Sequence, residues 1–478
     1  MLVNLIQGKY NIFISKRSGT GAERILPMGT YTKALENKAR EINPEEDIDY
    51  SEELIKVVEM FREFDEALDE FIINHGFAGD RQDIDEKIAF IRHKFEQKKI
   101  PLPRNMKKWY TEHKRIKKET AIRICFAFDL TVEETEDFMR RICLLRGLDC
   151  HNVEEAIYYY ALTNGLGYPE AQQLIDRVPK VSVGKIDFAR DVLYTSAILE
   201  EIKRFKSPET LIKYINANIG QFGYNNATAY KYIREMWEEI AGESGLAATE
   251  RKRLYAAFDD RDREIREEQA EEGYEEGQVM EERTGKPESD NGQGTSENRK
   301  AKDGRAGNRK NRSEKDRNSL WEIYLQILGL AGDQIARIDT DRSLKPILKD
   351  NALLHAWAED SFPSRTGLEK ILNGEHASEE MVHKTIILLV FYRFWVKSAL
   401  RNHGYQARIG DTDRCICEIN KYLIDAGYPE LYPGDPFDWI VLHAVENEFP
   451  LLVFRDFMRE LFYIKEKDID AKYRMEPD

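Results

Sequence analysis

The amino-acid sequence predicts an all-α protein with two helical lobes, a short N-terminal strand-like segment and a long charged linker. After about residue 50, apolar residues recur at steps of three and four, which indicates helices with one buried face. Helix-start signals precede several of these stretches: Thr131 is followed by glutamates, and Ser207 is followed by proline. Only Lys9–Lys16 alternates in the manner of a strand.

The predicted helices follow one another through the first half of the chain. They are expected at residues 54–72, 84–95, 118–128, 131–145, 153–164, 169–177, 189–206, 207–219 and 227–241. Two aromatic runs, Tyr158–Tyr160 and Phe391–Trp395, lie within helical patterns. This spacing favours packing in a core over a platform on which bases stack. The position of Trp439 among aliphatic neighbours predicts that it is buried as well.

Charge and composition mark a linker at residues 259–318. Asp259–Glu282 contains 12 acidic and three basic residues, whereas Arg299–Arg317 contains nine basic and three acidic residues. Almost nothing apolar stands between Val279 and Leu320, so burial cannot offset the entropy lost by ordering this stretch. The sequence therefore predicts a largely disordered linker.

The linker divides the chain into expected units. These are an N-terminal segment with a helical hairpin at 1–80, a helical lobe at 81–258 and a second helical lobe at 319–478. Limited proteolysis is expected to cut first between about Thr284 and Asn318 and to release two stable fragments.

The bulk composition excludes several classes of protein. A net charge of −15 argues against indiscriminate coating of nucleic acid. The sequence shows neither a signal peptide nor an apolar run of membrane-spanning length, so a cytoplasmic protein without membrane contact is expected. Five cysteines in so long a chain predict reduced thiols rather than disulfides or zinc ligands. No residue set typical of catalysis stands out, so the sequence predicts no enzyme, no cofactor and no metal site.

A local excess of positive charge is the strongest functional signal. Twelve basic residues lie between Arg92 and Arg123, against Glu96, Glu112 and Glu119, so the window carries a charge of about +9. Three interpretations remain open: a nucleic-acid-binding surface, a surface for an acidic protein partner or the chain's own acidic segment, or a solvated face. The candidate nucleic-acid-binding residues are Arg104, Asn105, Lys107, Lys108, Lys114, Arg115, Lys117, Lys118 and Arg123.

The second lobe repeats part of the first. Residues 103–128 align without a gap on residues 364–389, and residues 138–162 parallel residues 419–444. In the second pair, which begins at Phe138 and at Ile419, each stretch has a helix, a glycine, a polar turn and an aromatic helix. This pattern predicts an internal duplication.

These stretches resemble helix-turn-helix proteins of the lambda-repressor (XRE and Cro) family. Residues 364–378 are similar to that family's recognition helix and its closing Leu-Asn-Gly turn, and residues 419–445 resemble an extension found in bacterial members. The resemblance implies two divergent helix-turn-helix units, together covering about 70 residues of each lobe. It implies that Arg104, Asn105, Lys107 and Lys108 begin a recognition helix that reads bases and contacts phosphates. Lys114, Arg115, Lys117 and Lys118 would then hold phosphates from the next turn.

The sequence thus supports two functional hypotheses. The first is a transcriptional regulator that binds double-stranded DNA through the basic window at 92–123. The second is a non-enzymatic adaptor in a bacterial multiprotein system, built from degenerate helix-turn-helix units. Glu369, Glu375, Glu379 and Glu380 make the second unit acidic, which favours packing, a protein partner or self-association through 319–478 over DNA.

Overall fold

The computed structural model describes residues 30–42, 53–54, 56–57, 60–112, 115–181, 184–186, 188, 194–224, 226–253, 320–329, 365–402 and 404–462. Every regular element in these ranges is a helix, which confirms the predicted all-α fold. None of the described helices is long and apolar enough to cross a membrane. The strand-like segment at Lys9–Lys16 and the predicted linker at 259–318 lie outside the described residues.

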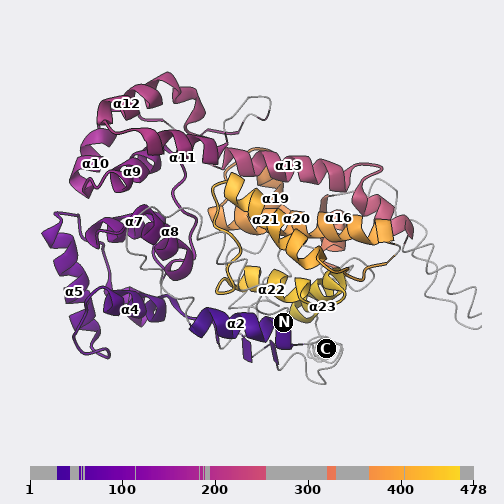
Figure 1. Cartoon of the computed structure of the whole chain (residues 1–478). Coiled ribbons are helices and arrows are strands. Elements are labelled where there is room, and N and C mark those ends of the chain that lie inside the picture. The colour runs from indigo at the N-terminus through magenta and orange to yellow at the C-terminus, as the bar shows by residue number, and fades with distance from the viewer. Residues whose placement is uncertain are drawn as a thin grey trace, which may run out of the picture.

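The middle of the chain forms one hydrophobic core, here the middle core, from residues between Phe64 and Phe222. Its helices occupy one side of the molecule (Figure 1). Tyr158, Tyr159 and Tyr160 are all buried in it, as their helical spacing predicted. The elements are α4 (Phe64–Asn74), α5 (Ile84–Gln97), α6 (Lys107–Thr111), α7 (Lys118–Ala127), α8 (Val132–Asp137), the π-helical η1 (Phe138–Ile142), α9 (Val153–Thr163), α10 (Tyr168–Ile175), α11 (Thr195–Arg204), α12 (Pro208–Ala217) and the short η2 (Ile219–Gln221).

A second core, here the terminal core, combines residues from both ends of the chain. Its central helix is α20 (Glu379–Asn402), which packs against α13, α21, α22 and α23. Burial of Phe391 and Trp395 on α20 confirms that this aromatic run belongs to a core. The other helices are α2 (Thr30–Glu41), α13 (Ala227–Ala241), α16 (Leu320–Ile327), α19 (Arg365–Leu372), α21 (Asp411–Asp425), α22 (Pro436–Val445) and α23 (Pro450–Phe462).

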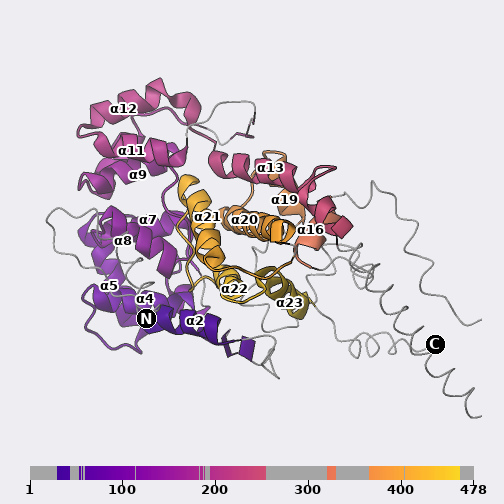
Figure 2. The ribbon, with the colours of Figure 1, turned by 45° about the vertical axis from the view of Figure 1, so that its right-hand side comes forward.

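The two cores group the helices differently from the expected units along the chain. α2 packs on α22, and α13 packs on α19, α20 and α21. Figures 1 and 2 both show α13 beside these C-terminal helices. Apolar periodicity identified the buried face of α13, which carries Tyr230, Ile233 and Met236. It could not identify the partner of that face, because the partner lies more than a hundred residues away in the sequence.

Local start signals specify several helices as predicted. Thr131 is the N-cap of α8, where its hydroxyl accepts a hydrogen bond from the Glu134 amide and Glu134 completes a capping box. Ser207 accepts a hydrogen bond from the Thr210 amide at 3.3 Å, and Pro208 occupies the first turn of α12. The expectation of one helix over 131–145 was wrong at its end. The helix changes to π-helical η1 and stops at Ile142, and Leu144 then takes a left-handed φ of 50°.

The loops that precede α9 and α22 are built by the same hydrogen bonds. Asn152 and Asp435 are the N-caps, and each side chain accepts from two backbone amides of the first turn. The Asp149 amide donates to Glu155 Oε2 at 2.6 Å, and the Tyr432 amide donates to Asp438 Oδ2 at 2.8 Å. The loops therefore correspond, with Glu155 in the place of Asp438.

This correspondence extends to the preceding helix pairs. α6 ends at Thr111 and α7 begins at Lys118, while α19 ends at Leu372 and α20 begins at Glu379. The gapless alignment pairs these ends with each other, so Lys118 corresponds to Glu379. In the second pair of stretches, the hydrogen bonds match Asn152 with Asp435 and so fix the register at the loops.

Described residues before position 254 and after position 319 meet in the terminal core. Gln326 Nε2 donates to the Ala247 carbonyl and to Glu250 Oε2, both at 2.9 Å. Arg455 also donates to both oxygens of Glu250, at 2.9 and 3.1 Å. Residues on either side of positions 254–319 are thus bound to each other and to α23.

These contacts change the expected outcome of proteolysis between Thr284 and Asn318. Both fragments contribute buried residues to the terminal core, so we expect the nicked protein to elute at its native size in gel filtration. The two fragments should separate only on denaturing electrophoresis. Elution as two smaller species under native conditions would contradict this packing.

Candidate nucleic-acid interface

The basic segment, residues 92–123, runs from the last turns of α5 through a loop and α6 into α7. α5 lies at the edge of the molecule that is far from α16 and α23 (Figures 1 and 2). Ile100 and Met106 anchor the loop, since only 4% and 6% of their surfaces remain exposed. The side chains between these anchors are therefore held on a fixed backbone at the surface.

Four of the nine candidate residues are exposed and make no ion pair within the described part of the chain. These are Arg104, Asn105, Arg115 and Lys117. Asn105 has a left-handed φ of 58°, a conformation that asparagine tolerates better than most residues. The three cationic side chains among them could therefore meet an anionic ligand without breaking an ion pair to a described residue.

Lys107 and Lys108 are exposed and carry surface ion pairs. Lys107 Nζ lies 3.1 Å from Asp85 Oδ1, and Lys108 Nζ lies 2.7 Å from Glu112 Oε1. Their side chains keep 61% and 46% of their surface exposed. Such pairs contribute little stability because water screens them, so a phosphate can replace either carboxylate at small cost.

Lys118 and Arg123 differ from the exposed residues, because both side chains bind other parts of the protein. Lys118 Nζ lies 2.8 Å from both Glu155 Oε2 and Glu379 Oε1, and only 14% of its side chain is exposed. Burial alone would lower the pKa of Lys118, but the two carboxylates raise it above its usual value. Arg123 Nη1 donates to the Pro101 carbonyl at 3.2 Å and so holds the loop. The structure thus keeps Lys118 away from a phosphate, and Lys114 lies outside the described residues.

α6 occupies the position expected for the first recognition helix. It has five residues, of which Trp109 and Tyr110 are buried. The loop between α5 and α6 spans residues 98–106, whereas the turn of a helix-turn-helix unit has about 3–4 residues.

The equivalent region of the second repeat is covered by the chain itself. The Tyr230 hydroxyl on α13 donates to the Glu375 carbonyl at 2.8 Å and accepts from the Ala377 amide at 2.9 Å. The Ile186 amide donates to the Gly374 carbonyl at 2.9 Å. The turn after α19 is therefore a packing surface for α13 and residue 186.

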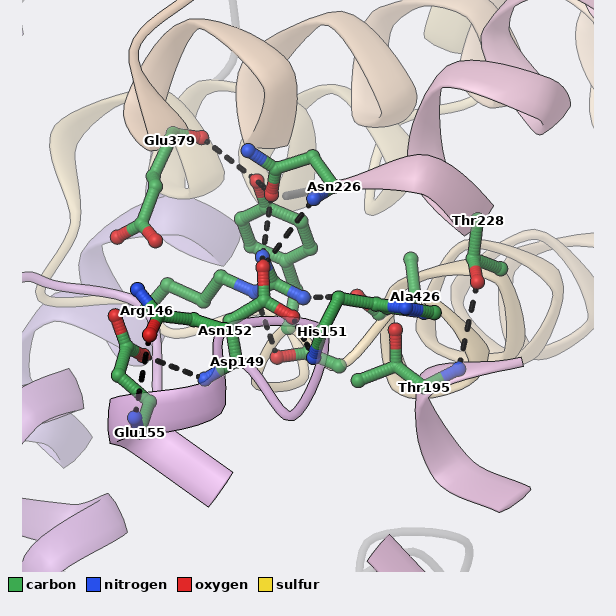
Figure 3. A network of polar contacts seen from close by, with 12 residues as sticks. Arg146, Asp149, His151, Asn152, Glu155, Thr195, Asn226, Thr228, Glu379 and Ala426 are labelled. Carbon is green, nitrogen blue, oxygen red and sulfur yellow. Dashed lines mark hydrogen bonds and ion pairs between the residues drawn. The ribbon is translucent and has the colours of Figure 1, made fainter. Parts of the chain in front are cut away.

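A buried polar cluster connects the two cores, and we call it the polar junction (Arg146, Asp149, Asn226 and Tyr428). Figure 3 shows Arg146 at its centre. Its Nη1 lies 2.8 Å from Asp149 Oδ2 and also donates to Asn226 Oδ1. Its Nη2 and Nε donate to the carbonyls of Ala426 and Gly427, at 2.6 and 3.1 Å. The guanidinium also lies 4.4 Å from the ring centre of Tyr428.

The electrostatics of the polar junction are those of a closed structural cluster. Burial alone would raise the pKa of Asp149, but the Arg146 guanidinium lowers it to about 2. Each nitrogen of Arg146 has an acceptor, and four of the five N–H groups of the guanidinium are bound within the protein. Sequence analysis missed these residues. The one available signal was an arginine and an aspartate spaced for a short-range ion pair in a loop.

Four of the five cysteines are buried free thiols, and Cys417 is exposed. Among the described residues, no group of three or more His, Cys, Asp and Glu side chains could hold a metal ion. Comparison with protein-family models, curated proteins and solved structures finds no match to this chain.

Proposed function

We propose that this protein is a cytoplasmic DNA-binding regulator that contacts duplex DNA through the exposed part of the basic segment. The observation that carries the proposal is the exposure of Arg104, Arg115 and Lys117, without ion pairs to any residue that the structure describes, in a chain of net charge −15. Such a local excess of cations is the electrostatic footprint of phosphate binding. Lys107 and Lys108 would also bind phosphates, in place of their surface ion pairs with Asp85 and Glu112.

Arg104 and Asn105 are the residues most suited to base contact. Both lie on the loop before α6, whose backbone is anchored by Ile100 and Met106. Arginine and asparagine are the side chains that most often read guanine and adenine edges. Sequence preference is therefore expected to depend on these two residues, and general affinity on Arg115 and Lys117.

The test is a mobility-shift titration of the intact chain with duplex DNA at several salt concentrations. Changing Arg115 and Lys117 together to alanine should weaken binding to all sequences alike. The slope of log affinity against log salt should fall by about two units, because each phosphate contact contributes about 0.9.

A matched control changes Lys213 and Lys231, two exposed lysines on α12 and α13, to alanine. That variant removes the same charge outside the basic segment and should bind as the parent does. Absence of salt-sensitive duplex binding by the parent would refute the proposal. If the Arg115/Lys117 variant then lost a protein partner, the adaptor hypothesis would replace it.

A further inference from the structure

A cavity lies at the contact between the two repeats, with about 40 Å³ of space for water-sized groups. Arg140, on η1 of the first repeat, lines it, as do His383 on α20 and Asp438 on α22 of the second repeat. Nη2 of Arg140 donates to the Leu431 carbonyl at 2.7 Å, which holds this arginine against the second repeat. The cavity therefore lies where the two repeats are joined.

Three polar atoms of these side chains are buried and have no hydrogen-bond partner among the described residues. They are Arg140 Nε, Asp438 Oδ1 and His383 Nε2. His383 Nε2 lies 3.8 Å from Asp438 Oδ1, which is too far for a direct hydrogen bond. A buried polar atom without a partner destabilises a fold, so three of them around one cavity indicate a group bound between them.

The backbone beside the cavity is irregular at the same place. Leu144 lines the cavity and has a left-handed φ of 50°, which a bulky side chain rarely adopts. It follows the π-helical turn that carries Arg140, and such turns are uncommon outside functional positions. Strained backbone of this kind persists where a structure holds a group in a fixed position, so it supports the same site as the polar atoms do.

The bound group has to accept hydrogen bonds as well as donate them. Arg140 Nε can only donate, which excludes an ammonium group, since that has no acceptor. Burial lowers the pKa of His383 to about 4, so its imidazole is neutral near pH 7, and Nε2 accepts in one tautomer and donates in the other. Burial and the neighbouring Asp435 raise the pKa of Asp438 well above its usual value, so its Oδ1 can also carry a proton. A neutral oxygen with both hydrogens and lone pairs satisfies all these states.

We propose that this cavity binds one water molecule, which links the two repeats. Its oxygen accepts a hydrogen bond from Arg140 Nε, and the molecule is hydrogen-bonded to Asp438 Oδ1 and His383 Nε2 whether or not Asp438 is protonated. A cavity needs only about 10–15 Å³ of such space to hold a water, and about three hydrogen bonds are usual for a buried one. This site is separate from the basic segment and does not depend on DNA binding.

Oxygen-17 relaxation dispersion of the solvent tests the site, because it counts the long-lived internal water molecules of the intact chain. Leu145 lines the cavity, and Leu145→Phe should fill it and lower the count by one. Leu452→Phe is the matched control, since Leu452 is 38% exposed on α23, and it should leave the count unchanged. An unchanged count in the folded Leu145→Phe variant would overturn the proposal.

Asp438→Asn separates a water from an ion held by the charge of Asp438. The asparagine amide can still accept the Tyr432 amide and can donate to or accept from a water, so the count should equal that of the parent. Loss of a long-lived water in this folded variant would contradict a neutral occupant.

A crystal structure of the intact chain gives a test that needs no variant. Density for a single oxygen should lie roughly 2.5–3.2 Å from Arg140 Nε, Asp438 Oδ1 and His383 Nε2. An empty cavity, where other buried waters are visible, or a bound ion in place of the oxygen would overturn the proposal.

Discussion

Replacing Arg146 with methionine is expected to lower the free energy of unfolding by about 3–5 kcal/mol. The Arg146 side chain is completely buried, as is Asp149, which would lose its counter-charge. The carbonyls of Ala426 and Gly427 would also lose their donor. Methionine restores much of the apolar volume, so the loss measures the unpaired carboxylate and carbonyls rather than a cavity.

Urea denaturation followed by circular dichroism measures this loss. Arg204→Met is the matched control, because Arg204 is 69% exposed and its ion pair with Glu201 is solvated. That control should change the free energy of unfolding by less than about 0.5 kcal/mol. An Arg146→Met variant as stable as the parent would show that the junction does not hold the two cores together.

Replacing Trp439 with alanine is expected to cost about 3–5 kcal/mol, because it leaves a large cavity in the terminal core. Trp439 is fully buried, as predicted from its aliphatic neighbours. Its ring stacks on His443 at 5.1 Å and meets the edge of Phe61 at 6.5 Å. Its Nε1 donates to the Leu35 carbonyl at 3.0 Å, so the substitution also loosens α2 from α22.

Thermal melts of two further variants separate the loss of apolar contact from the loss of the hydrogen bond to Leu35. Trp439→Phe keeps most of the apolar contact and loses the hydrogen bond to Leu35, so it should cost about 1–2 kcal/mol. Ile424→Ala is the surface control, since Ile424 is 47% exposed on α21. A melting temperature of Trp439→Ala equal to that of the parent would be inconsistent with the observed packing.

The helices were predictable because their signals are local. The caps at Thr131 and Ser207 act within one turn of each helix, and apolar periodicity is a property of a few consecutive turns. The grouping of helices into cores was not predictable in this way. α13 and α2 reach the terminal core through contacts with residues far away in the sequence, and a single sequence gives no sign of them.

The basic segment shows why a single sequence does not predict which of its lysines are exposed. Lys117 and Lys118 are adjacent and chemically identical, yet Lys117 is exposed and the side chain of Lys118 is only 14% exposed. Two carboxylates make the difference, and both are distant in the sequence: Glu155 on α9 and Glu379 on α20. The net charge of residues 92–123 therefore indicated a basic surface. It could not show which lysines face solvent and which bind carboxylates inside the fold.

The pairing of α2 with α22 has a consequence for the order in which the nascent protein folds. His443 Nδ1 lies 2.8 Å from the Ala39 carbonyl, across 404 residues of chain. At roughly 5–20 residues per second, a ribosome needs roughly 20–80 s to reach α22 after it has made α2. The middle core, by contrast, is complete once residue 222 has emerged. Until α22 emerges, Leu35, Ala39 and Ile42 cannot reach their buried positions against it, so the apolar face of α2 has to wait for most of the chain to be made.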